Sequence, residues 1–275
     1  MGARVGGTSG SESVVNAAAP STIEVHRDHV TDLVARAVAR TRFPWLGFSD
    51  PTAEMMLEAL DIDDSRYDDV SLRRALVPTI VVDTLVRDFF ERHRDGLALS
   101  VMCGLCTRFW RVDNGQLRWI DVDAPPIAQF KAPLQPTCER HAVASSCSFD
   151  CEGWLRCLRE ARDVPTLIVA QGMGRRVDRD ELDRFFESAS EHLATGVEII
   201  VDYDARRPLR PSSLRDTACL ELPRSDGSHA RYPRLRFAQS DDYPPELGHA
   251  VRGLNGLSRL FHGRGMPSIA HVRVV

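Results

Sequence analysis

The chain has 275 residues, of which 43% are hydrophobic and 27% charged, and its formal net charge is −4. This composition is ordinary for a soluble globular protein of one domain with an appendage, or of two small domains. The charge gives no large basic surface for nucleic acid, and no apolar run reaches the roughly 20 residues of a membrane span. The N-terminus lacks the pattern of an export signal, so we expect a cytoplasmic protein.

Lysine and cysteine are used unusually in this chain. Lys131 is the only lysine, and arginine supplies all the other positive side-chain charge, which indicates the codon bias of a GC-rich, bacterial genome. The seven cysteines are too dilute for a disulfide scaffold, and an odd number cannot all pair. In a reducing cytosol we interpret them as buried apolar residues, metal ligands or reactive thiols.

The first third of the chain is predicted to be helical after a disordered tail at residues 1–20, which are small, polar and glycine-rich. Apolar residues at helical spacing begin at residue 21 and stop before Pro44. Asp50 and Pro51 are typical of the N-cap and first position of a second helix. A third helix is predicted over residues 71–94, where Pro78 should kink or divide it.

Short apolar runs after residue 96 predict a mostly parallel sheet. Five strands are expected, at residues 97–103, 117–123, 140–148, 165–172 and 196–204. Between the last two, an acidic start and a glycine stop at Gly196 predict a helix, and strands alternating with helices indicate crossover connections. Towards the C-terminus we expect a strand at 234–240, a helix at 246–261 and a sheet-edge strand at 268–275.

The turn after the first predicted strand has features of a nucleotide site. Such a site needs small residues in the turn and a carboxylate at the end of the next strand, where ligands bind in open parallel sheets. Cys103 and Gly104 supply the turn, and Asp121 or Asp123 supplies the acid at the expected spacing of about 20 residues. A solvated loop acid would give the same pattern, so the spacing alone leaves both interpretations open.

Longer motifs narrow this choice. Residues 104–126 read GLCTRFWRVDNGQLRWIDVDAPP. In chain order the other motifs are DPTA at 50–53, VVDTLVRDF at 81–89, SFDCEGW at 148–154 and PTLIVAQGM at 165–173. Over residues 25–205 these motifs resemble the leucine carboxyl methyltransferase family, which includes the polyketide O-methyltransferases of the tetracenomycin type.

The resemblance implies a class I methyltransferase fold that binds S-adenosylmethionine. The fold would be an α/β, Rossmann-like, seven-stranded, mostly parallel sheet over residues 96–275, with residues 21–95 as an N-terminal helical lid. It implies a ribose contact for Asp123 and an adenine contact for Asp150. The implied cofactor-binding residues are Cys103, Gly104, Arg108, Asp123, Phe149, Asp150 and Gln171. It identifies no catalytic residue.

The chain departs from the family pattern near the methionine end of the cofactor. Pro78 stands where the family has an arginine, and Met102 stands where it has the first glycine of the turn. Cys106 replaces the family's turn aspartate, and Gln171 replaces its glutamate after the fourth strand. A lost arginine removes a bidentate partner for the cofactor carboxylate, and a lost glycine hinders close backbone approach. Arg175 and Arg176, just after the fourth strand, could compensate or bind a different anion.

The cysteines and histidines near this turn have alternative interpretations. Cys103 and Cys106 form a C-x-x-C that could join Cys147 and Cys151 in a four-thiolate metal site. The second pair lacks the usual spacing and the family needs no metal at Cys103, so we expect no bound metal. A reactive thiol at Cys106 is a further hypothesis. For His29 and its neighbour at 26, on the first helix, we expect solvated positions.

Two functions remain from the sequence. The first is an S-adenosylmethionine-dependent O-methyltransferase acting on a carboxylate or hydroxyl of a small hydrophobic, polyketide-like metabolite in bacterial secondary metabolism. The alternative is a methyltransferase-fold protein that has lost methyl transfer and acts as a cyclase, an isomerase or a non-catalytic biosynthetic partner. The expected partner is a small hydrophobic substrate, with a homodimer as a further hypothesis and neither nucleic acid nor membrane involved.

Overall fold

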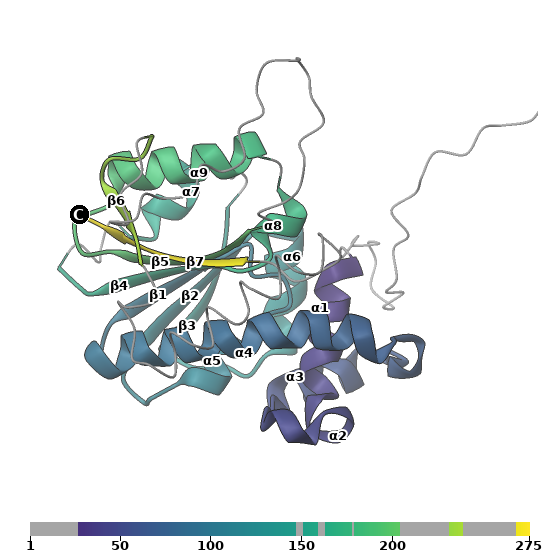
Figure 1. Cartoon of the computed structure of the whole chain (residues 1–275). Coiled ribbons are helices and arrows are strands. Elements are labelled where there is room, and N and C mark those ends of the chain that lie inside the picture. The colour runs from purple at the N-terminus through teal and green to yellow at the C-terminus, as the bar shows by residue number, and fades with distance from the viewer. Residues whose placement is uncertain (1–26, 147–150, 159–162, 178, 204–230, 239–267) are drawn as a thin grey trace, which may run out of the picture.

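The computed structural model is an α/β protein built on a seven-stranded sheet (Figure 1). It describes residues 27–146, 151–158, 163–177, 179–203, 231–238 and 268–275. The predicted tail at 1–20 and the predicted helix at 246–261 lie outside these residues. The strands are β1 Leu97–Val101, β2 Arg118–Asp123, β3 His141–Ser145, β4 Thr166–Ala170, β5 Glu198–Tyr203, β6 Leu235–Phe237 and β7 Ser268–Val274.

The sheet has the order β3-β2-β1-β4-β5-β7-β6, and its first five strands are parallel. Strands β1 and β4 lie side by side and are buried at every position. Helices cover both faces of a parallel sheet, which is why these strands appear in the sequence as continuous apolar runs. The predicted fold class, a Rossmann-like and mostly parallel seven-stranded sheet, is confirmed.

The last strand corrects one prediction. The sequence predicted a sheet-edge strand at 268–275, but β7 pairs antiparallel with β5 on one side and with β6 on the other. Ile269 belongs to the apolar cluster on one face of the sheet, and Val272 and Val274 belong to the cluster on the opposite face. An alternating pattern shows that side chains point to two faces but not which strand pairs alongside.

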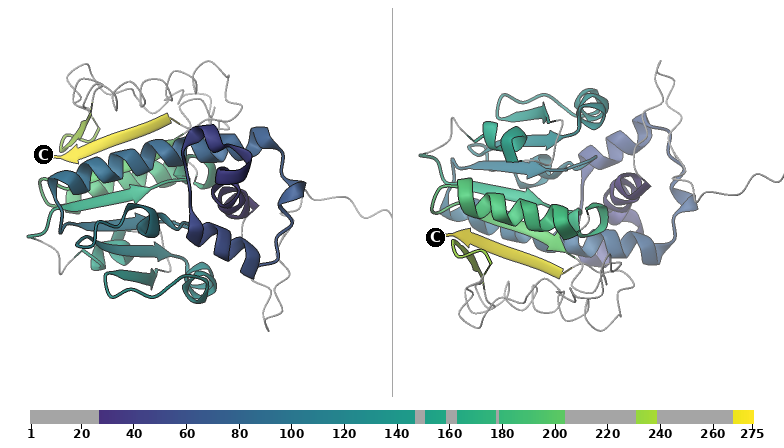
Figure 2. Two further views of the ribbon diagram at one scale, coloured as in Figure 1. Left: turned by 90° about the horizontal axis from the view of Figure 1, so that it is seen from below. Right: turned by 90° about the horizontal axis from the view of Figure 1, so that it is seen from above.

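Two layers of helices enclose the sheet (Figures 1 and 2). Helices α4 Asp69–Arg92 and α5 Arg108–Val112 cover one face, whereas α7 Cys151–Arg156 and α9 Arg179–His192 cover the other. Each face has its own buried core: Phe89, Phe109 and Trp119 lie on the first side, and Trp154 and Phe186 on the second. Helix α6 Pro125–Lys131 connects β2 to β3, and α8 Met173–Arg176 follows β4.

The N-terminal helices lie beyond the carboxyl ends of the parallel strands (Figure 1). They are α1 Arg27–Ala37, α2 Ala39–Arg42 and α3 Pro51–Ala59, with short 3-10 turns at Pro44–Leu46 and Asp64–Arg66. They share an apolar core that also includes Leu105, from the loop after β1. The helices therefore pack directly on the loop where the sequence predicted the cofactor. The predicted boundaries between domains stay predictions.

Two predictions concern helix ends and breaks. The Asp50 side chain accepts a hydrogen bond from Ala53 N at 3.0 Å and Pro51 occupies the first turn, so the predicted cap is confirmed. Pro78 does not divide its helix, because α4 runs without interruption from residue 69 to 92. Of the helices that the structure describes, none is both long and apolar enough to cross a membrane.

Candidate functional site

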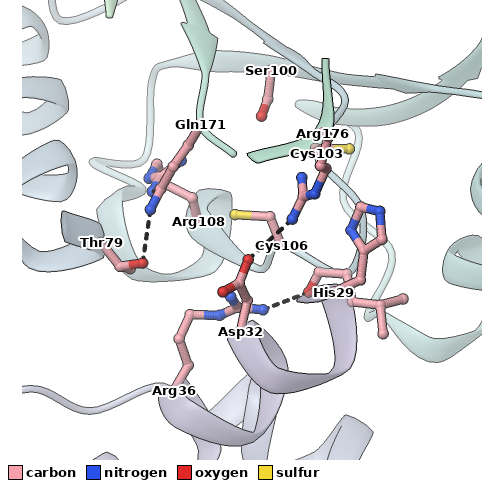
Figure 3. Close-up of a pocket in the computed structure, with 11 residues that line it drawn as sticks. His29, Asp32, Arg36, Thr79, Ser100, Cys103, Cys106, Arg108, Gln171 and Arg176 are labelled. Atoms are coloured by element: carbon pink, nitrogen blue, oxygen red, sulfur yellow. Dashed lines mark hydrogen bonds and ion pairs between the residues drawn. The ribbon is translucent and has the colours of Figure 1, made fainter. Parts of the chain in front are cut away.

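A small cavity lies between the carboxyl ends of β1 and β4 and helix α1 (Figure 3). Helix α1 contributes side chains from one side of the cavity, and the segments after β1 and β4 contribute them from the opposite side. The lining residues are His29, Asp32, Arg36, Thr79, Ser100, Cys103, Leu105, Cys106, Arg108, Gln171 and Arg176. Three of the predicted cofactor residues, Cys103, Arg108 and Gln171, thus surround one space.

The turn after β1 keeps the backbone shape that glycine favours. Met102 has φ of 52° and Gly104 has φ of 51°, both in the left-handed region. Met102 N donates a hydrogen bond to Val122 O at 2.9 Å, and Gly104 N donates to Asp123 Oδ2 at 2.6 Å. Met102, which the resemblance aligned with a glycine, therefore adopts a conformation that costs a side-chain-bearing residue roughly 1–2 kcal/mol.

This strain predicts an inverted order of stability at position 102. Met102→Gly and Met102→Ala both remove the partly buried side chain, but only glycine relieves the left-handed strain. We expect Met102→Gly to be more stable than Met102→Ala by about 1 kcal/mol, whereas glycine is usually the less stable of the two. Urea unfolding of both variants measures the difference, and an alanine variant that is the more stable would contradict it.

The two candidate acids after β2 have different surroundings. Asp121 is buried and accepts hydrogen bonds from Lys131 Nζ at 2.5 Å and Trp119 Nε1 at 2.8 Å. Burial tends to raise the pKa of Asp121, but Lys131 and His141 outweigh it and lower the pKa to about 2. Asp121 is therefore an internal partner of Lys131, and no face of it is open to a ligand.

Asp123 stands at the end of β2, where the sequence placed the cofactor acid. Its Oδ1 accepts from Ala124 N at 2.8 Å, while Oδ2 holds Gly104 N. The side chain is only partly buried, so its remaining lone pairs can reach a ligand above the turn. Of the two acids that the sequence offered, Asp121 and Asp123, the structure therefore favours Asp123 as the one that could contact a ligand.

Arg108 and Gln171 are bound to each other and to α4. Arg108 Nε donates to Asp83 Oδ1 at 2.6 Å, and a second Arg108 nitrogen donates to Gln171 Oε1. Gln171 Nε2 donates to Thr79 Oγ1 at 3.0 Å, and that hydroxyl donates onward to Ala75 O. A glutamate at 171 could accept from Arg108 but could not donate to Thr79, which explains why an amide suits this position.

Asp83 is the buried carboxylate that joins α4 to α5. Besides Arg108, it accepts from Arg111 Nε at 2.8 Å. Burial tends to raise the pKa of Asp83, but the charges of Arg111 and Arg108 outweigh it and lower the pKa to about 2. Arg108, which lines the cavity, is therefore held in place by an ionised carboxylate.

Acid should weaken the fold through Asp83. Its folded pKa of about 2 lies below its ordinary value of 3.8, so it contributes stability above roughly pH 4 that is lost as the pH falls through 2. The shift corresponds to about 2 kcal/mol. Urea unfolding of the wild type and Asp83→Asn should show a difference that shrinks between about pH 6 and pH 3. A difference that stays constant over this range would contradict the assignment.

The two cysteines of the turn have opposite electrostatic environments. Burial and Asp121 raise the pKa of Cys103. At Cys106 burial also acts upwards, but Arg108, Arg36 and further cations outweigh it and lower the pKa. Among the described residues no group of three or more histidines, cysteines or acids could hold a metal ion. Cys147 lies outside those residues, so the absence of a metal site stays a prediction.

Helix α1 closes the cavity on the side opposite the strand ends. His29, expected to be solvated, is instead buried, and its imidazole lies on the turn: a Cβ added to Gly104 would be 1.6 Å from His29 Nδ1. One helical turn on, Asp32 Oδ2 pairs with Arg176 NH2 at 3.0 Å, and Arg176 NH1 donates to Met102 O at 3.1 Å. The helical periodicity did not show that the face of α1 carrying these residues meets the sheet. The other histidine of this pair, at 26, lies outside the described residues.

The closed site is much smaller than its proposed ligand. The cavity encloses about 20 Å³, room for about one water molecule. A larger groove of about 410 Å³ adjoins it at Gln171 and runs between α1 and the first turns of α4, past Pro78 and Tyr67. Charged side chains from both helices line this groove. Phe149 and Asp150, two further residues that the resemblance implied, lie outside the described residues.

The strand order agrees with the fold that the resemblance implied. A sheet ordered β3-β2-β1-β4-β5-β7-β6, with β7 antiparallel and an acid ending β2 beside a turn after β1, is the class I methyltransferase arrangement that the resemblance implied. No protein-family model matches the chain. Similar sequences are found among curated proteins, and similar folds among solved structures.

Three curated proteins illustrate the likeness. The tetracenomycin polyketide synthesis O-methyltransferase TcmP of Streptomyces glaucescens is 29% identical over 231 residues, which is 78% of this chain and 82% of TcmP. The S-adenosyl-L-methionine-dependent methyltransferase dpfgK of Gibberella zeae is 25% identical over 74% of this chain and 72% of its own. A putative methyltransferase of the same kind from Mycobacterium marinum is 28% identical over 54% of this chain and 49% of its own. The predicted resemblance to methyltransferases of the tetracenomycin type is confirmed.

Two solved structures are similar at a lower level. A putative methyltransferase from Thermobifida fusca has a TM-score of 0.39 and 17% identity, covering 64% of this chain and 68% of that one. Human N-acetylserotonin methyltransferase in complex with SAM has a TM-score of 0.34 and 12% identity, covering 66% and 55%.

Proposed function

We propose that the chain is an S-adenosylmethionine-dependent O-methyltransferase of small-molecule metabolism. One observation carries the proposal: Asp123 ends β2 and holds the Gly104 turn, in a chain that aligns with 82% of a tetracenomycin O-methyltransferase. Such an acid and turn serve nucleotide cofactors in open parallel sheets. The substrate would be a carboxylate or hydroxyl of a polyketide-like metabolite.

The turn beside the cavity fits this cofactor in its chemistry. Asp123 would accept the ribose hydroxyls, and the Gly104 turn would allow close backbone approach. Asp150 would serve the adenine by the resemblance alone. The cofactor does not fit into the space at this turn in the present conformation, because the His29 ring lies directly against Gly104. Binding therefore requires α1 to withdraw, after which its return would exclude water from the reacting groups.

The chemistry needs little from the protein beyond position. When bound, the cofactor supplies a methyl group already activated by the sulfonium. The chain would hold the acceptor oxygen in line with that methyl, and such orientation can lower a barrier by several kcal/mol. A carboxylate acceptor is ionised at neutral pH and needs no base, whereas a hydroxyl would need one.

The acceptor would lie in the groove beside Gln171. The groove offers about 410 Å³, and six of its twelve lining residues are charged, with Ala75 and Pro78 as its apolar part. This mixture suits a hydrophobic scaffold that carries polar or charged groups, more than a purely apolar one. Its position next to Gln171 would put the acceptor beside the proposed cofactor site.

A transfer assay tests this function. The purified chain is incubated with S-adenosylmethionine and a panel of aromatic acids and phenols, and S-adenosylhomocysteine and methylated products are measured. We expect turnover with at least one acid or phenol, and none after Asp123→Ala. Tight cofactor binding without turnover on any acceptor would favour the alternative, a methyltransferase fold that has lost transfer. The closed cavity and the Gln171 amide network are the observations that keep this alternative.

A further inference from the structure

Three guanidinium groups reach the cavity, and two of them are already matched by buried acids. Arg108 pairs with Asp83 at 2.6 Å, and both side chains are almost completely buried. Arg36 Nε lies 3.3 Å from Asp50 Oδ2, another fully buried carboxylate, and its NH2 donates to Leu105 O. The charges of these two arginines are therefore already balanced by acids of the fold.

Arg176 differs from the other two in its carboxylate partner. Among the described residues, Asp32 on α1 is the acid that pairs with it, at 3.0 Å. The Arg176 side chain is 8% exposed and the Asp32 side chain 16%. Figure 3 shows Asp32 rising from α1 to meet Arg176 across the cavity. The second Arg176 nitrogen holds Met102 O, so the same guanidinium fixes the turn after β1. A carboxylate from a separate, overlying helix thus sits in the candidate cofactor site.

We propose that Arg176 binds the carboxylate of the cofactor's methionine part, and that Asp32 occupies this place in the ligand-free chain. The assignment rests on the proposed function. Arg176 offers its charge from the last residue of α8, the short helix that follows β4. The exchange conserves charge: one carboxylate leaves as another arrives, so the buried guanidinium is never left unpaired.

The same exchange would open the site. His29 and Asp32 are three residues apart, so they share one face of α1. Movement that releases Asp32 from Arg176 also lifts the His29 ring from Gly104, which is the space that a nucleoside needs. Asp32 is therefore a competitor of the cofactor carboxylate, and α1 is held closed until that carboxylate replaces it.

Two ligands separate the carboxylate contact from the rest of the cofactor. S-adenosylhomocysteine carries the amino-acid carboxylate, and 5′-methylthioadenosine has the same nucleoside without it. We expect Arg176→Gln to weaken S-adenosylhomocysteine binding about 10- to 100-fold in calorimetric titration and to leave 5′-methylthioadenosine nearly unchanged. Arg118→Gln, an exposed arginine at the amino end of β2, is the matched control and should change neither.

Asp32→Asn tests the competing carboxylate. It should tighten S-adenosylhomocysteine binding roughly 3- to 10-fold, because the open form becomes more populated. Without any ligand it should also speed alkylation of Cys106, which lines the cavity, relative to Cys157 in the same chain by peptide mass spectrometry. Glu58→Gln removes an exposed carboxylate from α3 and serves as the matched control.

The outcomes separate this inference from the proposed function. If wild type binds both ligands but Arg176→Gln affects neither, or both equally, Arg176 is not the carboxylate contact and the methyltransferase proposal stands. If Asp32→Asn leaves affinity and Cys106 alkylation at wild-type values, Asp32 is not a competitor. If wild type binds neither ligand, the proposed function falls and this assignment falls with it.

Discussion

Replacing Asp123 by alanine is expected to weaken S-adenosylmethionine binding by about 30- to 1,000-fold. Two charge-assisted hydrogen bonds to the ribose would be lost. The structure adds a second cause, because Asp123 Oδ2 also holds Gly104 N at 2.6 Å. Without that acceptor the turn would lose its shape as well as its ligand contact, so Asp123 should be the most sensitive position of the site.

Asp123→Asn separates the two causes. The amide oxygen can still accept from Gly104 N, but the amide nitrogen cannot accept from Ala124 N, and the contacts to the ribose are no longer charge-assisted. We expect both its affinity in calorimetric titration and its melting temperature to lie between those of wild type and Asp123→Ala. An Asp123→Ala variant with wild-type affinity would remove Asp123 from the cofactor site.

The Asp121–Lys131 pair should give the largest change in stability. Lys131, the only lysine, is fully buried, and its Nζ lies 2.5 Å from Asp121 Oδ2 and 3.4 Å from Cys103 Sγ. Asp121→Asn leaves the ammonium without its counter-charge, and uncompensated buried charges typically cost about 3–5 kcal/mol. The cost should appear in the free energy of unfolding by urea at neutral pH.

Removing both charges is the test of this explanation. Because a buried ion pair can often be replaced by uncharged residues at little cost, Asp121→Asn with Lys131→Met should recover most of the lost stability. Arg140→Gln, which breaks the partly exposed pair with Asp113, should cost less than about 1 kcal/mol and serves as a control. A double variant no more stable than Asp121→Asn alone would show that the charge imbalance is not the cause.

The strands could be predicted because burial on both faces leaves a plain signal. Thr166–Ala170 and Leu97–Val101 are buried throughout, so their apolar runs stand out from any alternating or helical pattern. The pairing of β7 could not be predicted in the same way. Its neighbour β6 has three residues, and nothing in an alternating segment identifies which strand will cover its open edge.

The sequence indicated which part of the chain forms the candidate site. It did not indicate which side chains would pair with one another there. Asp121 and Asp123 are two residues apart in one strand, and only the position of Lys131, ten residues on, shows which of them is neutralised internally. The left-handed conformation at Met102 could not be predicted from the residue, since methionine gives no sign of it.

The contacts that α1 makes with the rest of the protein could not be predicted from the sequence. His29 and Asp32 lie in an ordinary amphipathic pattern, in which polar residues are expected to face water. Their burial depends on Gly104 and Arg176, which are distant in the sequence and meet α1 only when the sheet has formed. A polar residue on the inward face of a helix signals such a contact only when its partner is known.

Calorimetric titration of the wild-type chain with S-adenosylmethionine and S-adenosylhomocysteine tests the central claim most directly. We predict that both bind at one molecule per chain, with an accompanying rise in melting temperature, and that Asp123→Ala weakens both. Binding that is undetectable in the wild type, and stays undetectable in Met102→Gly with Gln171→Glu, would contradict the methyltransferase function.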